Sequence, residues 1–338
     1  MLKRNIFATI LTNAAPSSNY RGEGDGSSRS VLQKIMKYDI NGKINEYTVI
    51  SSESIKSAIR EILELKTHEV NRTRLPLNFV HQIAVKYDGF SNENKYIDDF
   101  IFGYMNVQKN NPDEDSDEDS DEDIDNKKES KTKKCNKTSN CQKNRDSLLR
   151  MNIGVSISPY NDEILFHQSP MKINKEDIEK NQKSSNNMVL WTNEISYTAY
   201  QYPFAISLSE FINSTENNEL IIKKKNWIKE LLIAIGELSN VAGGHSRSYF
   251  EMYPKSIVLR FTDSLVCGYD TYGFDINGNF IPLQRVNGND LPYNEFWIGG
   301  EIARNMSENT KNDLKQKGMN IEDNTQKLLL NIANEIIK

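Results

Sequence analysis

Apolar residues recur along the chain with two periods, which predict alternating strands and helices. Runs rich in β-branched and aromatic residues predict strands, at 5–11, 78–88, 151–157 and 256–262. A period near 3.6 predicts a first helix with an apolar stripe of Ile55, Ala58, Ile59, Ile62 and Leu63, capped by Ser51 or Ser52. A second helix carries the stripe Trp227, Ile228, Leu231, Leu232 and Ile235, and a third covers 325–338. Asn41-Gly42 and Asn277-Gly278 are typical of hairpin turns.

The order of these elements predicts an α+β fold. Without insertions, the chain runs strand, helix, strand, and then again strand, helix, strand, which is the ferredoxin-like pattern. RNA-recognition domains share this frame and bind single strands on the sheet face. The aromatic signature of ordinary RNA-recognition motifs is absent, and the frame alone does not decide function.

A polar insert interrupts this pattern between 109 and 147. It holds 12 acidic and 9 basic residues and almost no apolar ones, so we expect it to be disordered. It lacks the glycine and the terminal Glu of a calcium-binding loop. The whole chain has a net charge of −5, whereas non-specific nucleic-acid binders are usually basic. Any RNA-binding surface must therefore be local.

Several function classes find no support in the motifs. The four histidines have no metal-binding spacing, and neither a nucleophile elbow nor a Walker A motif occurs. Cys135, Cys141 and Cys267 fit neither a disulfide framework nor a zinc site, which predicts free thiols in a reducing cytoplasm. No apolar run approaches the length of a membrane span, and the first residues are typical of a strand rather than a signal peptide. We expect no cofactor and no metal.

Three segments could hold an anion. They are the polar loop 13–34, the start of the first helix with its free amides and nearby Lys56 and Arg60, and the glycine pair in the segment 242–247. Each has a simpler explanation: a flexible loop, an ordinary cap with a solvated face, and a glycine that ends a helix. A ferredoxin-like frame would place all three together, which favours a groove for a phosphate backbone.

Five blocks in fixed order resemble the DevR-type backbone proteins of CRISPR–Cas type I complexes. They are ILTNAAPSSNYRGEG with RSVLQKI, SSESIKSAIREIL, LLRMNIGVSISPY, YQYPFAISL and GGHSRSYFEMYPKSIVLRFT. The resemblance spans most of the chain and fails only in the acidic insert and near 161–194.

This resemblance implies a hand-shaped RAMP protein that carries the guide RNA (crRNA) in a type I, I-B-like Cascade. The ferredoxin-like palm would comprise 1–67, 148–160 and 197–338, with a finger or web insertion at 68–147 and a candidate thumb hairpin at 161–196. Copies would stack in a helical filament along one guide, beside other Cascade subunits, and the guide would pair with target DNA. The resemblance implies no enzymatic activity, and we expect a cytoplasmic protein without membrane contact.

The implied RNA contacts combine small polar residues, glycines and a few cations, because a guide carrier must hold phosphates without reading bases. The expected RNA-binding residues are Asn13, Ser17, Ser18, Tyr20, Arg21, Arg29, Gln33, Lys34, Ser52, Ser54, Lys56, Arg60, Gly243, Gly244, His245, Ser246 and Arg247. A thumb that unstacks bases needs an apolar wedge, for which the candidates are Leu165, Phe166, His167 and Met171. Ordinary hairpin packing would explain the same cluster.

Two other functions remain open at this point. Related subunits of type III complexes cut target RNA with an Asp in the loop after the first strand, where this chain has Asp25 between two glycines. A lone Asp in a glycine loop is more often a turn residue. The chain could also be a regulatory protein without RNA, which predicts a discrete oligomer and no bound nucleic acid.

Overall fold

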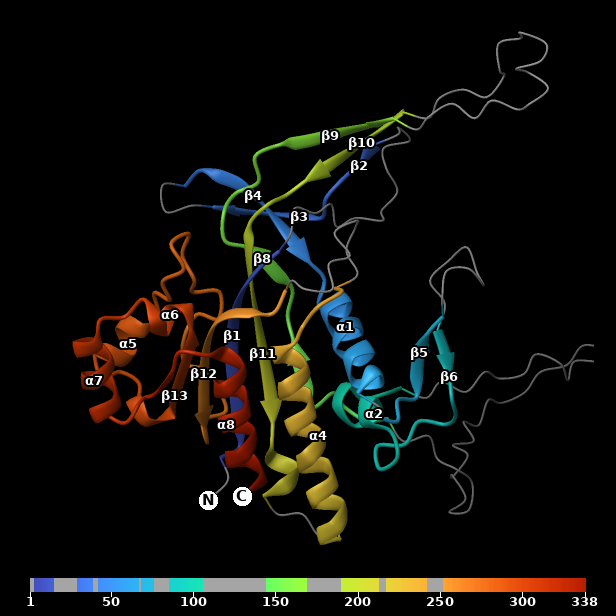
Figure 1. The fold of residues 1–338 in the computed structure, drawn as a ribbon, viewed down its shortest axis with the longest axis vertical. Helices are drawn as coiled ribbons and strands as arrows, with labels where there is room; N and C mark the ends of the chain where they lie inside the picture. The colour runs from blue at the N-terminus through green and yellow to red at the C-terminus, as the bar shows by residue number, and fades with distance from the viewer. Residues whose placement is uncertain are drawn as a thin grey trace, which may run out of the picture.

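One large mixed β-sheet organises the fold, and smaller sheets project from it (Figure 1). The computed structural model describes residues 3–14, 29–38, 42–66, 68–75, 85–105, 144–168, 190–212, 217–241 and 252–338. The strands of the large sheet are β1 (Asn5–Asn13), β3 (Lys34–Tyr38), β4 (Ile44–Ile50), β7 (Leu149–Met151), β8 (Gly154–Ser156), β11 (Ala199–Ser207), β12 (Pro254–Thr262), β13 (Phe296–Gly300) and β14 (Asn320–Glu322). Their order is β14-β13-β12-β1-β11-β8-β4-β3, with β7 beside β11.

The remaining strands form two small sheets. A three-stranded sheet contains β2 (Arg29–Ser30), β10 (Leu190–Ile195) and β9 (Glu163–Gln168), and a hairpin contains β5 (Arg72–Arg74) and β6 (Val85–Tyr87). The helices are α1 (Ser52–Leu65), α2 (Ile97–Phe102), α4 (Asn218–Gly236), α5 (Leu283–Asn287), α6 (Glu301–Arg304), α7 (Glu308–Gln316) and α8 (Thr325–Ile337), with 3-10 turns η1 (Ser209–Phe211) and η3 (Tyr293–Glu295).

The sheet buries a separate hydrophobic core on each face. Strand residues such as Ile6, Ile10 and Leu259 pack with α1, α4 and α8 on one face, which these helices cover in Figure 1. Alternate residues such as Leu11 and Val258 point to the other face, because successive side chains of a strand point in opposite directions. There they meet the segment from 269 to 321, which contains α5, α6 and α7.

The predicted first helix is confirmed in detail. The Ser51 hydroxyl accepts a hydrogen bond from the Ser54 amide and so caps α1. The expected stripe from Ile55 to Leu63 is buried against the sheet. The second and third predicted helices appear as α4 and α8, and the first and last predicted strands appear as β1 and β12. Strands β3 and β4, on either side of the predicted Asn41-Gly42 turn, pair antiparallel, while residues 39–41 lie outside the described residues.

The strand predicted over 151–157 is divided in two. Met151 pairs with Phe204 and Val155 with Gln201, so one extra residue bulges from the ladder between β7 and β8. The partner strand β11 carries Pro203 at this point, which has no N–H to donate. Its carbonyl still accepts from the Asn152 amide at 3.2 Å. A continuous ladder would lack one backbone hydrogen bond at Pro203. The bulge lies at the position where that hydrogen bond is missing.

The expected disordered insert has ordered residues at its end. The Arg145 backbone exchanges hydrogen bonds of 3.0 Å with Tyr104 in both directions. The Ser147 hydroxyl donates to the Ile101 carbonyl at 3.2 Å. These contacts seat residues 144–147 against α2, whereas 106–143 lie outside the described residues. Most of the strand expected over 78–88 also lies outside them, and β6 covers its end.

Candidate nucleic-acid interface

Helix α1 holds four of the expected RNA-binding residues. Ser52 and Ser54 lie in its first turn, and Lys56 and Arg60 follow one and two turns later. The Ser54 hydroxyl shares a hydrogen bond of 2.9 Å with the capping Ser51. Lys56 forms an ion pair with Glu53 at 3.0 Å. Successive helical residues are turned by about 100°, so the four side chains do not all point the same way, and part of their bonding capacity is used within the helix.

Arg60 is more enclosed than a solvated helix face would require. Its side chain is 14% exposed, and its Nε lies 3.3 Å from the Asp98 carboxylate on α2. Its guanidinium stacks on the Phe102 ring at 4.4 Å. Burial, together with the nearby Arg72 guanidinium, lowers the pKa of Arg60, while Asp98 opposes that change. The group stays protonated at neutral pH because its ordinary pKa is very high.

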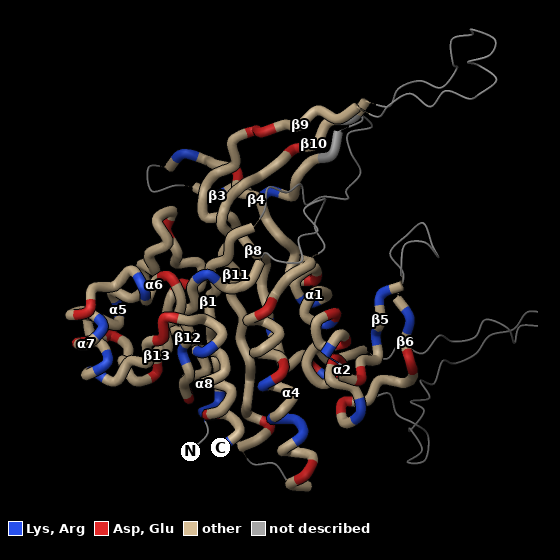
Figure 2. Tube along the Cα trace, in the orientation of Figure 1, with Lys and Arg blue, Asp and Glu red and all other residues tan. Residues whose placement is uncertain are grey.

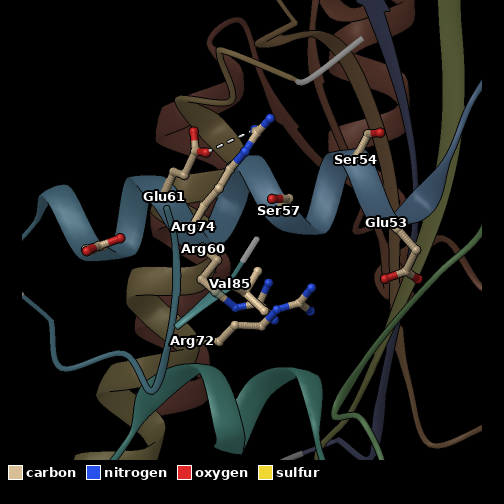
Figure 3. Close-up of a pocket in the computed structure, with 9 residues that line it drawn as sticks. Glu53, Ser54, Ser57, Arg60, Glu61, Arg72, Arg74 and Val85 are labelled. Carbon is tan, nitrogen blue, oxygen red and sulfur yellow. Dashed lines mark ion pairs between the residues drawn. The ribbon is translucent and has the colours of Figure 1, made fainter. Parts of the chain in front are cut away.

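A groove of about 230 Å³ runs between α1 and the β5–β6 hairpin, as Figure 3 shows. Its lining consists of three arginines, three glutamates, two serines and a valine: Arg60, Arg72, Arg74, Glu53, Glu61, Glu64, Ser54, Ser57 and Val85. Two of these, Ser54 and Arg60, are expected RNA-binding residues, and the structure brings them to one side of the groove.

The two arginines of β5 were missed from the sequence. Arg72 and Arg74 are two residues apart on a strand, so both side chains point to the same face. The spacing of two residues between Arg72 and Arg74 is the sequence signal from which both could have been predicted as cations on one face of a strand. Arg74 pairs with Glu61 across the groove at 3.5 Å. Arg72 is exposed and forms no ion pair within the described part of the chain.

Arg60 and Arg72 are the two groove cations whose side chains come together, in a lining with as many glutamates as arginines. Figure 3 shows the Arg60 and Arg72 side chains converging between α1 and α2, with Arg74 turned toward Glu61. Two guanidinium groups offer planar sets of donors that match phosphate or carboxylate oxygens. The three glutamates keep the net charge low, which fits the acidic composition of the chain. Cations on β5 and β6 are visible in Figure 2.

Lys34, another expected RNA-binding residue, lies in a different network. Its ammonium is 3.1 Å from Glu46 and 3.3 Å from Glu194, and it lies over the Tyr160 ring at 4.4 Å. These carboxylates raise its pKa against the opposing effect of burial. The positive charge of Lys34 is thus already balanced by the protein. Asn13 and Gln33 are exposed, at the end of β1 and just before β3.

The candidate thumb contains an antiparallel hairpin of β9 and β10, with β2 parallel to β10. Leu165 and Phe166 are exposed by 44% and 62%, and His167 is half-buried. Neighbouring strand residues point to opposite faces, so the hairpin presents an apolar side chain on each face. Packing within the hairpin therefore does not cover them. Met171 lies outside the described residues.

The other expected site residues are not described by the structure. Ser17, Ser18, Tyr20 and Arg21 fall in 15–28, and Gly243, Gly244, His245, Ser246 and Arg247 fall in 242–251. Only the backbone of Arg29 is described, within β2. Convergence of the three anion-binding segments therefore stays a prediction.

Within the described residues, no group of three His, Cys, Asp or Glu side chains could hold a metal ion. Cys267 is a free thiol there, as predicted, and burial raises its pKa. Cys135, Cys141 and Asp25 lie outside the described residues. No described helix is both long enough and apolar enough to cross a membrane.

The fold is that of subunits found in CRISPR RNA-guided surveillance complexes. A chain of a pre-nicking surveillance complex matches with a TM-score of 0.56 and 11% identity, covering 98% of this chain and 99% of that one. A chain of a second surveillance complex matches with a TM-score of 0.54 and 13% identity, covering 98% of each. The expectation of an α+β fold is thereby confirmed as far as a mixed fold of helices on a large sheet.

A sequence relative is more specific. The chain is 26% identical over 312 residues to the CRISPR-associated protein Cas7/Cst2/DevR of Myxococcus xanthus (strain DK1622), covering 89% of this chain and 88% of the relative. No protein-family model matches the chain. The resemblance to DevR-type CRISPR-associated proteins is confirmed.

Proposed function

We propose that this chain is the guide-RNA-binding backbone subunit of a type I CRISPR surveillance complex. The observation that carries the proposal is the similarity to Cas7/Cst2/DevR over 89% of the chain. The fold shared with surveillance-complex chains supports it independently of sequence identity. The subunit binds guide RNA, contacts further copies of itself and other Cascade subunits, and meets target DNA through the guide. It works in the cytoplasm.

The palm is ferredoxin-like in this proposal. Support comes from the consecutive strands β12, β1, β11 and β8, whose neighbours are antiparallel. Helix α1 lies between β1 and β8 in sequence, and α4 lies between β11 and β12. Two split βαβ units give this order. The insertion at 68–147 then contributes β5, β6 and α2, and the thumb at 161–196 contributes β9 and β10.

The groove beside α1 holds part of the guide backbone. Arg72 and Arg60 supply charged donors to phosphate oxygens, and the serines at the helix start supply neutral ones. None of these groups needs to read a base, which suits a protein that must accept any guide sequence. The exposed apolar residues of the thumb hairpin separate stacked bases of the guide.

The subunit holds RNA without cutting it in this proposal. The rival activity would use Asp25, as type III backbone subunits use an Asp in the corresponding loop. Metal-dependent cleavage of a target RNA that is lost in Asp25→Ala would overturn the non-catalytic assignment. Equal and negligible cleavage by both proteins, in complexes that bind the target, is the expected result.

The first test is co-expression of the full chain with its partner subunits and a guide-RNA array. We expect a large multimer whose absorbance at 260 nm exceeds that at 280 nm, with RNA of one guide length on sequencing. A folded protein that purifies without nucleic acid despite its partners would contradict the proposal and favour a regulatory role.

A single substitution then tests the groove. Arg72→Ala removes an exposed guanidinium from the groove. The slope of log K for guide-RNA binding against log salt concentration should therefore become shallower by about one. Lys315→Ala is the matched control because it removes an exposed cation from α7, on the opposite side of the molecule in Figure 1. Equal effects of the two variants would show that the groove is not an RNA contact.

A further inference from the structure

The buried Asp98 on α2 contacts both arginine-bearing elements of the groove. Asp98 is 3% exposed. Its carboxylate accepts two backbone hydrogen bonds, from the Asn71 amide at 2.7 Å and the Arg72 amide at 3.1 Å. The same carboxylate lies 3.3 Å from the Nε of Arg60. One side chain thus connects helix α1, strand β5 and helix α2.

Asn71 extends this connection to the rest of the hairpin. Its side-chain oxygen accepts from the amides of Asp88 and Gly89 at 3.1 and 3.0 Å, just after β6. Its side-chain nitrogen donates to Asp99 at 3.0 Å. The start of β5 is therefore fixed from both sides. As a result, the direction in which Arg72 leaves the strand depends on the carboxylate that holds its amide.

The arrangement keeps two like charges close together. The Arg60 and Arg72 guanidinium groups converge in Figure 3, and their repulsion helps to lower the pKa of Arg60. Repulsion of this kind would turn mobile side chains apart, and a bound anion would relieve it. The buried Asp98 carboxylate places a negative charge beside Arg60, and the Phe102 ring packs against the Arg60 guanidinium.

We propose that Asp98 is a positioning residue, which lies against the Nε of Arg60 and holds the Arg72 backbone amide so that both guanidinium groups face one phosphate of the guide. The inference rests on the proposed function, because it assumes that the groove receives RNA. Asp98 itself does not touch the RNA. It acts by fixing donors before binding, which reduces the entropy that ordering them would otherwise cost.

The test is a double-mutant cycle with the full chain and a fluorescent guide RNA. Asp98→Asn keeps an acceptor for one of the two backbone amides, and it removes the second oxygen and the charge that face Arg60. We expect affinity to fall about tenfold in the wild-type background, as for loss of a charge-assisted contact. In an Arg60→Ala/Arg72→Ala background the same substitution should have little further effect, because the groups it positions are gone.

Glu295→Gln is the matched control. Glu295 also pairs with a buried arginine, with 2.7 Å between its carboxylate and Arg260, but it lies in η3 and does not line the groove. It should leave guide affinity and its salt dependence unchanged. If Asp98→Asn binds like the wild type, or weakens binding equally in both backgrounds, the positioning role is wrong. Wild-type protein that binds no guide would instead contradict the proposed function.

A second variant covers the case in which Asp98→Asn does not fold. Arg60→Lys keeps the positive charge but loses the planar guanidinium, whose Nε lies beside Asp98 and whose face lies over Phe102. We expect its guide affinity to fall about tenfold as well, since orientation rather than charge is lost. Wild-type affinity for this variant would overturn the proposal. Thermal unfolding of each variant shows that the compared proteins are folded.

Discussion

Asp98 and Asp99 are adjacent on α2, yet their carboxylates are stabilised differently. Asp98 has a guanidinium beside it, whereas Asp99 accepts hydrogen bonds from Asn71 and Asn92. Burial raises the pKa of Asp99 above its ordinary value of 3.8, and the negative charge of Asp98 adds to this effect. Ionised Asp99 therefore lowers the stability of the folded protein at neutral pH.

This difference predicts how stability depends on pH. A raised pKa means that the folded state binds the proton of Asp99 more tightly than the unfolded state does. Protonated Asp99 therefore stabilises the folded protein fully below the ordinary pKa, and this stabilisation is lost as pH rises through the raised pKa. Asp99→Asn should thus increase the free energy of unfolding at pH 7, and the gain should vanish below about pH 4. Urea unfolding at several pH values measures it. A constant difference between the two proteins across that range would contradict the assignment.

Individual residues were predictable where one local rule decides them. The apolar stripe of α1 and a serine cap at 51 or 52 follow from the sequence, and the structure has the stripe and caps the helix with Ser51. The partner of Arg60 could not be predicted, because Asp98 is brought to it by the fold of the insertion rather than by sequence distance. The same holds for Lys34, whose partner Glu194 lies on a distant strand. Periodic spacing in the sequence predicts helices and strands, but the two residues of a long-range ion pair have no regular spacing.

Among the elements, the base of the thumb hairpin depends on a buried carboxylate. Glu194 on β10 is 2% exposed, accepts from the Leu32 amide at 2.9 Å and pairs with Lys34. It joins the hairpin to the edge of the large sheet. Glu46 pairs with the same lysine from β4, but its side chain is 41% exposed.

Replacing this carboxylate should loosen the hairpin selectively. We expect Glu194→Gln to cost about 1–3 kcal/mol locally, because the half-buried Lys34 ammonium loses the more buried of its two carboxylate partners. Amide hydrogen exchange should accelerate in β9 and β10 and stay slow in α4 and α8. Glu46→Gln should have a smaller effect because that carboxylate is more exposed. Acceleration spread evenly over all helices would show that Glu194 supports the whole fold instead.

Long elements with clear periodicity were predicted better than short ones. Helices α1, α4 and α8 and strands β1 and β12 follow from their patterns. The break between β7 and β8 was not predicted, because its cause is Pro203 on the partner strand. Strands β13 and β14 and helices α5 to α7 were also missed; their short segments become ordered by packing on the second core.

At the scale of the whole molecule, the proposed wedge role of the exposed apolar residues in the β9–β10 hairpin predicts a periodic pattern along the guide. In a filament, each copy should interrupt guide stacking at a fixed interval, so ribonuclease protection should repeat along the guide. Leu165→Ser/Phe166→Ser should remove the repeat while guide binding persists, since phosphate contacts carry most of the affinity. Leu265→Ser/Val266→Ser is the control, because both residues are exposed outside the hairpin. A repeat that survives in the thumb variant would contradict the wedge role.

The central position of β1 has a consequence for synthesis of the protein. This first strand lies between β11 and β12, and Asn5 pairs with Ser207 on one side and with Thr262 on the other. At usual translation rates its second edge therefore stays unpaired for on the order of 10 to 50 s. Open apolar strand edges invite aggregation, and such distant contacts slow folding. Yield should thus depend on chaperone capacity and on translation speed, even for variants with an unaltered native state.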